Sequence, residues 1–177
     1  VPLTVSHPSI WVVVPAYNEE RSIDGVLREL TALGYSIVVV DDASTDRTAD
    51  IVTAHEVVLS RHVTNRGQGA ALRTGIREAL ERGAEVIVTF DADGQHAAAD
   101  VPRLVEAVVE RGAEVALGTR FDRGRAIDIP PVRKILLRAG AFATRLSTGV
   151  RVTDTHNGLR AFSRRAASLL RITEEGR

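Results

Sequence analysis

Short apolar runs alternate with amphipathic segments along residues 10–118. Five runs are rich in Val and Ile and are continuous rather than alternating, namely residues 10–14, 36–40, 56–60, 85–90 and 114–118. Continuous runs of this length are typical of strands that are buried on both faces of a parallel sheet. We therefore predict a strand at each run.

Three of the intervening segments have apolar residues at helical spacing. Their apolar faces are Ile23, Val26, Leu27 and Leu30; Ala71, Gly75, Ile76, Ala79 and Leu80; and Val101, Leu104, Val105 and Val108. Asn18 is available as the N-cap of the first helix, and Gly34, Gly83 and Gly112 are available as stop signals. Repeated alternation of strand and helix implies right-handed crossovers and predicts an α/β fold with a doubly wound sheet.

The chain changes character after Gly118. The stretch "TRFDRGRAIDIPPVRK" is rich in Gly, Pro and Arg, and we expect a long loop of the kind that is usually functional in compact domains. A length of 177 residues fits one domain. The chain stops in "RITEEGR" without a closing element, and we expect its C-terminal part to be incomplete.

The net charge of zero conceals a difference between two parts of the chain. Residues 1–118 hold 10 arginines and 18 acidic residues, whereas residues 119–177 hold 13 basic and 5 acidic residues. The first part can tolerate a bound cation and the second a bound anion, although two solvated faces of different charge would give the same counts.

Composition excludes several classes of protein. A hydrophobic content of 44% argues for a folded globule, and the absence of cysteine excludes disulfides and thiolate metal sites and fits a reducing compartment. No apolar stretch approaches the roughly 20 residues of a membrane span, and no charged-then-apolar leader opens the chain. We expect a soluble or peripheral protein.

Polar clusters follow each predicted strand at its carboxyl end. They are "PAYNEE", "DDASTD", "TNRGQG", "DADGQH" and "GTRF". Ligands of open α/β sheets bind outside the carboxyl ends of the strands, so the shared edge predicts a binding site. Asp46, before "RTADIV", is better explained as a helix cap.

Asp91 and Asp93 favour a metal site at this edge. In an extended segment, residues two apart point to the same side, and two carboxylates that converge repel each other unless a cation or proton intervenes. Oxygen ligands without cysteine favour Mg²⁺ or Mn²⁺. Gln95, two residues after Asp93, would point to the same side of the extended segment and could supply a further oxygen. We expect His96 to be solvent-exposed. Two aspartates in this spacing also occur by chance, so the residues alone leave a role without metal open.

Five motifs together resemble a known family. "VVVPAYNEE", "IVVVDDASTD", "NRGQGAALRTGI", "FDADGQH" and "DTHNGLRAF" are similar, in order and spacing, to family 2 glycosyltransferases of the GT-A fold. The resemblance covers residues 10 to about 163. The motif "DTHNGLRAF" narrows it to the polyprenyl-phosphate sugar transferases of the dolichyl-phosphate mannosyltransferase type. It implies a Rossmann-like, mostly parallel sheet flanked by helices in a single domain.

The resemblance implies roles for residues that match the family's motifs. In residues 1–118 it implies contacts to the nucleotide sugar from Pro15, Ala16, Tyr17, Glu19, Asp41 and Asp91. In the same part, Asp42, Gly67 and Gly69 are expected to lie on the nucleotide side of the site. Alternatively, Asp42 binds a loop and the two glycines only allow the chain to turn. The implied metal ligands are Asp91, Asp93 and Gln95. In residues 119–177, Arg120 and Arg133 are expected to face phosphate groups. Asp154, Asn157 and Arg160 are expected to border the acceptor. The expected catalytic residues are Asp93, Arg120, Arg133 and Asp154.

The implied reaction is transfer of a hexose from GDP-mannose or UDP-glucose to a polyprenyl or dolichyl phosphate, dependent on Mg²⁺ or Mn²⁺. A metal bridging the diphosphate would stabilise charge on the leaving group, while the sugar becomes oxocarbenium-like. A phosphate monoester is mostly dianionic at neutral pH, so it needs cations such as arginine rather than a strong base. We expect inversion at the anomeric carbon. The expected partners are a nucleotide-sugar donor and a lipid-phosphate acceptor at a membrane surface, with no nucleic acid. The expected location is cytoplasmic and peripheral to the membrane.

Alternative interpretations remain open within and outside the family. The acceptor could be soluble or a glycan, or the chain could be an inactive nucleotide-binding relative. A receiver domain would need a lysine after the last strand, and the only lysine is Lys134. A haloacid-type phosphatase would place its aspartates at the start of the domain, a dinucleotide-binding domain would have glycines in place of "PAYNEE", and a nucleotidyltransferase would have a basic, Gly-rich loop there. The base, the sugar, the choice of metal and the oligomeric state are left open.

Overall fold

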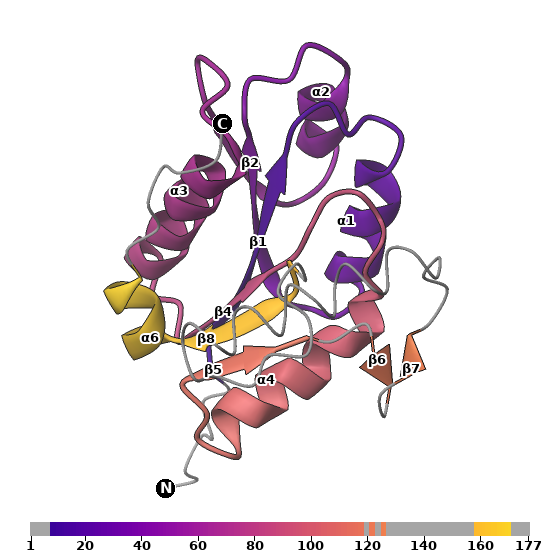
Figure 1. The fold of residues 1–177 in the computed structure, drawn as a ribbon. Helices are drawn as coiled ribbons and strands as arrows, with labels where there is room; N and C mark the ends of the chain where they lie inside the picture. Colours follow the sequence, from indigo (N-terminus) through magenta and orange to yellow (C-terminus); the bar gives the residue numbers. More distant parts are fainter. Residues whose placement is uncertain (1–7, 119–120, 123–124, 127–157, 171–177) are drawn as a thin grey trace, which may run out of the picture.

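The computed structural model describes residues 8–118, 121–122, 125–126 and 158–170. Six strands form one mixed sheet in the order β3-β2-β1-β4-β8-β5 (Figure 1). They are β1 Ile10–Ala16, β2 Ser36–Asp41, β3 Val58–Arg61, β4 Val86–Thr89, β5 Val115–Leu117 and β8 Arg160–Ser163. Two further short strands, β6 Phe121–Asp122 and β7 Arg125–Ala126, pair with each other. All five predicted strands are confirmed.

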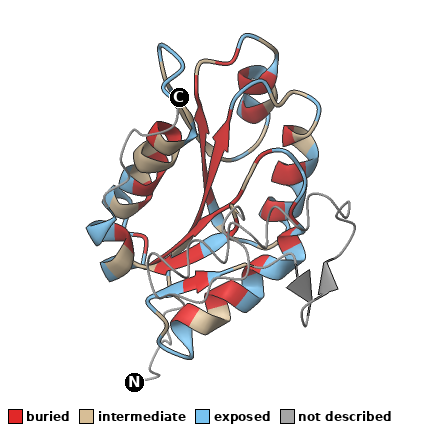
Figure 2. Cartoon of the chain, viewed as in Figure 1, coloured by how far each residue is buried: buried red, intermediate tan, exposed pale blue. Residues whose placement is uncertain are grey.

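The parallel part of the sheet is buried on both faces. Strand β1 pairs in parallel with β2 and β4, and β2 pairs in parallel with β3. Every residue of β1 after Ile10 and of β2 after Ser36 is buried (Figure 2). Val12 and Val14 face one side, and Trp11 and Val13 face the other. This two-sided burial is the physical reason for the continuous apolar runs.

Strand β8 is the main element that the pattern of apolar residues did not predict. It lies antiparallel between β4 and β5, with Ala161 opposite both Val88 and Ala116. Because it runs in the opposite direction, its first residue, Arg160, lies opposite Thr89 at the end of β4. Gly158 and Leu159, which precede β8, are therefore brought to the carboxyl edge of the parallel strands.

Helices cover both faces of the sheet. They are α1 Ile23–Thr31, α2 Thr48–Thr53, α3 Gln68–Glu81, α4 Val101–Val109 and α6 Arg164–Leu169, with a short 3₁₀ helix, η1, at Ala98–Asp100. Helices α1, α2 and α4 pack on one face, and α3 and α6 pack on the other (Figure 1). The predicted mostly parallel sheet flanked by helices is confirmed. Within the described ranges, no helix is long and apolar enough to cross a membrane.

The predicted N-cap of α1 is wrong. The helix begins at Ile23 after the N-cap Ser22, and Asn18 instead has a left-handed backbone with φ of 55°. The Asn18 side-chain oxygen accepts a hydrogen bond from the backbone N–H of Thr45 at 2.8 Å. A short amide side chain tolerates this conformation, so Asn18 forms a turn that joins two loops instead of capping the helix.

Candidate functional site

The loops after β1 and β2 are joined by side-chain hydrogen bonds. The backbone N–H of Glu19 donates to Thr48 Oγ1 at 2.8 Å, and the backbone N–H of Glu20 donates to Asp46 Oδ2 at 3.1 Å. These hydrogen bonds join the first polar clusters, "PAYNEE" and "DDASTD", into one rim. Pro15 and Ala16 are buried in this rim, whereas Tyr17 is 46% exposed.

Asp46 binds the first residue of α2 with its side chain, as a capping residue would, although the N-cap position itself is held by Arg47. The Asp46 Oδ1 atom accepts a hydrogen bond from the backbone N–H of Thr48, the first residue of the helix, at 2.9 Å. Partial burial raises the pKa of the Asp46 carboxyl, but hydrogen bonds from Thr48 and Glu20 outweigh it and hold the pKa below its ordinary value. This carboxylate has a structural role.

Asp41 is fully buried and paired with an arginine. Its Oδ1 atom accepts from the backbone N–H of Ser44 at 3.0 Å, and its Oδ2 atom accepts from Arg61 Nε at 2.7 Å. The Arg61 side chain is 56% exposed, so the pair presents its cationic member to solvent at the sheet edge. Contact of Asp41 with a base or ribose stays a prediction.

Asp42 binds the loop between β3 and α3. Its carboxylate accepts hydrogen bonds from the backbone N–H groups of Arg66 at 2.9 Å and Gly67 at 2.7 Å, and lies 2.6 Å from His62 Nδ1. His62 Nε2 in turn lies 2.9 Å from Thr74 Oγ1. The expectation that Asp42 binds a loop is confirmed, and its direct contact with a nucleotide stays a prediction.

Gly67 forms the turn into α3, which confirms its structural interpretation. It has φ of 86°, a conformation that strains residues with a Cβ atom, and it immediately precedes the helix. Gly69 lies in the first turn of α3. Contact of either glycine with the donor stays a prediction.

Asp91 lies two residues after the end of β4 and is held by two side chains. Gln68 Nε2 donates to Asp91 Oδ1 at 3.0 Å, and His96 Nε2 lies 3.1 Å from Asp91 Oδ2. The Asp91 side chain is 19% exposed, whereas the His96 side chain is 4% exposed. The expectation that His96 is solvent-exposed is therefore wrong, because its ring packs edge-on against Phe90 with 5.8 Å between the ring centres.

The expected extended geometry of Asp91, Asp93 and Gln95 is also wrong. The chain turns at Ala92 and Asp93, and Gly94 has φ of 71°. Asp93 Oδ1 accepts a hydrogen bond from the backbone N–H of Gln95 at 2.9 Å, which closes the turn. Asp93 and Gln95 are exposed. Their positions relative to Asp91 are set by this turn and not by the alternation of side chains along a strand.

Asp91, Asp93 and Gln95 carry oxygen atoms of the type that a hard divalent cation prefers, and such a cation would need a further ligand to complete its shell. Among the described residues there is no group of three or more His, Asp or Glu side chains that could hold a metal by themselves. Mg²⁺ typically takes one or two carboxylates and completes its shell with substrate phosphates and water. Asp91, Asp93 and the side-chain oxygen of Gln95 provide donors of this kind.

The acceptor side is described only in part. Arg160 is exposed at the start of β8, beside the end of β4. Thr89 Oγ1 donates to the carbonyl oxygen of Gly158 at 2.6 Å, which holds the residues before β8 against β4. The other predicted residues of this part, Arg120, Arg133, Asp154 and Asn157, lie outside the described residues.

Sequence reasoning missed three residues that contact Asp91. Gln68 and His96 donate hydrogen bonds to it, and Gly158 lies so close that a Cβ atom on it would overlap the Asp91 carboxylate. A signal was present for Gly158, because glycine inside a polar motif often marks close approach of the backbone to another group. Gln68 and His96 had no such signal.

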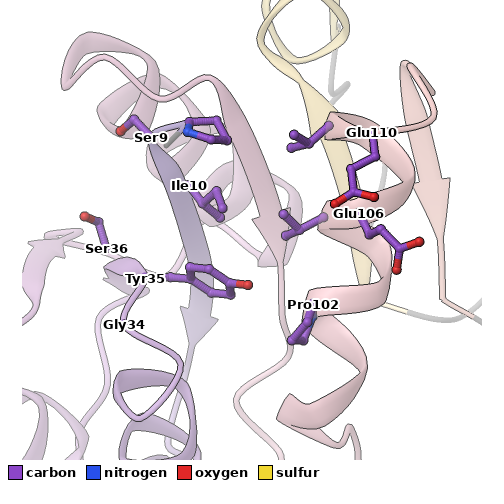
Figure 3. A pocket seen from close by; sticks show the side chains of 11 residues that line it. Ser9, Ile10, Gly34, Tyr35, Ser36, Pro102, Glu106 and Glu110 are labelled. Carbon is purple, nitrogen blue, oxygen red and sulfur yellow. The ribbon is translucent and has the colours of Figure 1, made fainter. Parts of the chain in front are cut away.

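A hollow of about 520 Å³ lies at the opposite edge of the sheet. It is formed by residues at the start of β1 and β2 and by α4, including Ile10, Tyr35, Ser36 and Glu106 (Figure 3). Burial raises the pKa of the Tyr35 phenol. The hollow is distinct from the predicted site, because it adjoins the amino ends of the parallel strands.

A family model for glycosyl transferase family 2 matches residues 11–170. The chain belongs to this family. A UDP-N-acetylglucosamine–dolichyl-phosphate N-acetylglucosaminyltransferase of Methanococcus voltae is 36% identical, over 91% of this chain and 72% of the relative. An undecaprenyl-phosphate mannosyltransferase of Micrococcus luteus is also 36% identical, over 86% of this chain and 65% of the relative. The resemblance to polyprenyl-phosphate sugar transferases is thus confirmed.

A solved structure supports the GT-A fold. Glucosyl-3-phosphoglycerate synthase from Mycobacterium tuberculosis, in complex with Mn²⁺, UDP and phosphoglyceric acid, aligns with a TM-score of 0.67 and 26% identity. The alignment covers 89% of this chain and 56% of that enzyme. This glycosyltransferase domain therefore spans little more than half of that relative's length.

Proposed function

We propose that this domain is a metal-dependent, inverting glycosyltransferase that moves a hexose from a nucleotide sugar to a polyprenyl or dolichyl phosphate. The observation that carries the proposal is the position of Asp91. Its partly exposed carboxylate stands at the carboxyl end of β4, held by Gln68 and His96, at the edge where Asp41 and Asp42 organise the neighbouring loops. The lipid phosphates in the names of both relatives support the acceptor.

The donor would lie across the carboxyl ends of β1, β2 and β4. Its nucleoside would contact the rim formed by Pro15, Ala16, Tyr17, Glu19 and Asp41. Asp42 would contribute by holding the turn at Gly67 and the start of α3, because its carboxylate is buried and already binds that loop. The diphosphate would then lie near Asp91 and Asp93.

Asp91, Asp93 and Gln95 would hold the divalent cation. When bound, a cation there neutralises the negative charge that develops on the departing nucleoside diphosphate. Arg160, together with Arg120 and Arg133, would hold the acceptor phosphate close to the sugar, since an arginine fork matches phosphate geometry. A dianionic phosphate attacks without a strong base, so the protein's contribution is to position two anionic partners.

A transfer assay tests the proposed function. Labelled GDP-mannose, UDP-glucose and UDP-N-acetylglucosamine are each incubated with the protein, a polyprenyl phosphate and Mg²⁺ or Mn²⁺, and the lipid extract is counted. We expect one hexose donor to label the lipid only when a divalent cation is present, with inverted anomeric configuration by NMR. A lipid product with retained configuration would contradict the mechanism.

A soluble acceptor is the second candidate. The neighbouring M. tuberculosis enzyme is described in complex with phosphoglyceric acid, an acid that carries a phosphate but no lipid. The same assay with phosphoglycerate in place of polyprenyl phosphate separates the two candidates. If only phosphoglycerate is labelled, the acceptor is a soluble phosphate and not a lipid phosphate. The donor and metal assignments would be unchanged.

A further inference from the structure

The carboxylate of Asp91 is restrained from three separate parts of the chain. Gln68, the first residue of α3, binds Oδ1 at 3.0 Å, and His96, in the loop after β4, binds Oδ2 at 3.1 Å. Gly158, just before β8, adjoins the same carboxylate. A surface carboxylate that only interacted with solvent would not need these neighbours.

His96 is built into the fold as a hydrogen-bond donor to Asp91. An ionised carboxylate can only accept hydrogen bonds, so His96 Nε2 carries the hydrogen in this contact. The ring is buried and packs edge-on against Phe90, which fixes its plane and limits the directions from which it can donate. The contact therefore sets the orientation of Asp91 rather than following it.

Gln68 ties the position of Asp91 to the start of α3. The preceding residue, Gly67, is held by Asp42 Oδ2 at 2.7 Å, and Ala71 N donates to the carbonyl oxygen of Gly67 at 3.1 Å. The buried Asp42 carboxylate thus holds the first turn of α3 in place. Gln68 lies in that turn, and its side chain hydrogen-bonds Asp91. Gln68 and His96 contact different oxygen atoms of the Asp91 carboxylate, so together they restrain both of them.

Gly158 gives the Asp91 carboxylate the space that it occupies. Any larger residue at this position would place its Cβ atom on Asp91 Oδ2. The hydrogen bond from Thr89 Oγ1 to the Gly158 carbonyl holds the backbone there, so the chain cannot withdraw without breaking it. Glycine at position 158 therefore has a physical reason: the backbone of this residue approaches the Asp91 carboxylate closely.

We propose that His96 and Gln68 are positioning residues that orient Asp91 for the cation and the donor diphosphate, and that Gly158 is required for the same geometry. The proposal rests on the proposed function, since it assigns the supporting residues of that site. Groups that hydrogen-bond a metal-binding side chain typically change metal affinity by about 10- to 100-fold when they are removed.

The test is Mn²⁺ affinity of the full chain in the presence of UDP or GDP, measured from the EPR signal of free Mn²⁺. We expect His96→Ala and Gln68→Ala to raise the Mn²⁺ Kd by about 10-fold or more. His96→Gln, whose amide N–H can replace the Nε2 donor, should recover part of the affinity. Nucleotide affinity without metal should stay within about two-fold of the original chain, which a general loss of structure would not allow.

His55→Ala is the matched control. His55 also pairs with an aspartate, with its Nε2 atom 3.0 Å from Asp24 Oδ1, but the pair lies between α1 and the end of α2. We expect this variant to keep the original Mn²⁺ Kd. If His96→Ala does not fold by circular dichroism, Gln68→Ala decides, because its side-chain contact is exposed.

The outcomes separate this inference from the proposed function. If the unaltered chain binds Mn²⁺ with a nucleotide and both alanine variants stay within two-fold of its Kd, the positioning role is overturned and the proposed function stands. If the unaltered chain binds no Mn²⁺ with either nucleotide, the metal-dependent function fails and the inference fails with it. A Kd raised equally by His55→Ala would also overturn the specific role of His96.

Discussion

Asp42 and Gly67 are joined by a hydrogen bond of 2.7 Å between a buried carboxylate oxygen and a backbone N–H, which connects the end of β2 to the turn before α3. The sequence places these residues in separate motifs, and the bond makes them one unit. The loop at the carboxyl edge therefore depends on a carboxylate that is almost completely buried. Its removal has consequences for both stability and binding.

We expect Asp42→Asn to lower the free energy of unfolding by about 1–3 kcal/mol, because an amide NH₂ would face backbone N–H groups that need an acceptor. Urea unfolding followed by circular dichroism measures the change. Glu29→Gln makes the same carboxylate-to-amide change at an exposed position of α1, and we expect an effect within about 0.5 kcal/mol. Equal effects for the two variants would mean that the Asp42 contacts do not stabilise the loop.

Two helical glycines should respond differently to substitution by alanine. A Cβ atom on Gly75 in α3 would overlap Val13 Cγ1 of β1, whereas one on Gly25 in α1 would meet nothing within 4 Å. Alanine is favoured over glycine in a helix by about 1 kcal/mol, so Gly25→Ala should stabilise the fold by up to that amount. Overpacking costs typically about 1–3 kcal/mol, so Gly75→Ala should be the less stable of the two.

Thermal and urea unfolding of both glycine variants provide the comparison. A Gly75→Ala protein as stable as Gly25→Ala would show that α3 can move away from β1 without loss, contrary to the close packing of this face.

The contribution of Asp46 should depend on pH. Because the folded state lowers the pKa of this carboxyl, the unfolded chain binds more protons between the folded and the unfolded pKa, and stability from Asp46 rises with pH in that window. That stability is present above the unfolded pKa near 3.8 and is lost as pH falls through the folded pKa. We expect Asp46→Ala to cost about 1 kcal/mol at pH 7.

The difference between Asp46→Ala and the unaltered chain should shrink below about pH 4. Urea unfolding at a series of pH values measures it. A difference that stays constant down to the folded pKa would show that the carboxylate charge does not contribute to the start of α2.

The parallel strands could be predicted from sequence because burial on both faces leaves continuous runs such as residues 36–40. Strand β8 could not, because Arg160 and Ser163 flank only two buried residues and its partners are distant in sequence. Such a strand is specified by its neighbours in the sheet rather than by its own periodicity.

The candidate site could be predicted to a similar extent. The carboxyl edge and the position of Asp91 follow from strand order, whereas the relation of Asp91 to Asp93 depends on a turn that Gly94 and an Asp93 side-chain bond create. The burial of His96 depends on packing against Phe90, a contact set by how the loop after β4 closes. Local patterns carry no information about such closure.

The central claim is that Asp91 takes part in holding a divalent cation together with the diphosphate of a donor. Thermal shift with UDP and GDP, each with and without Mn²⁺, tests it most directly, because a ligand that binds only the folded state raises Tm. We predict a Tm increase with one nucleotide that requires Mn²⁺ and that Asp91→Asn abolishes. A metal-dependent increase of the same size in Asp91→Asn, or no increase with either nucleotide in the unaltered chain, would contradict the account.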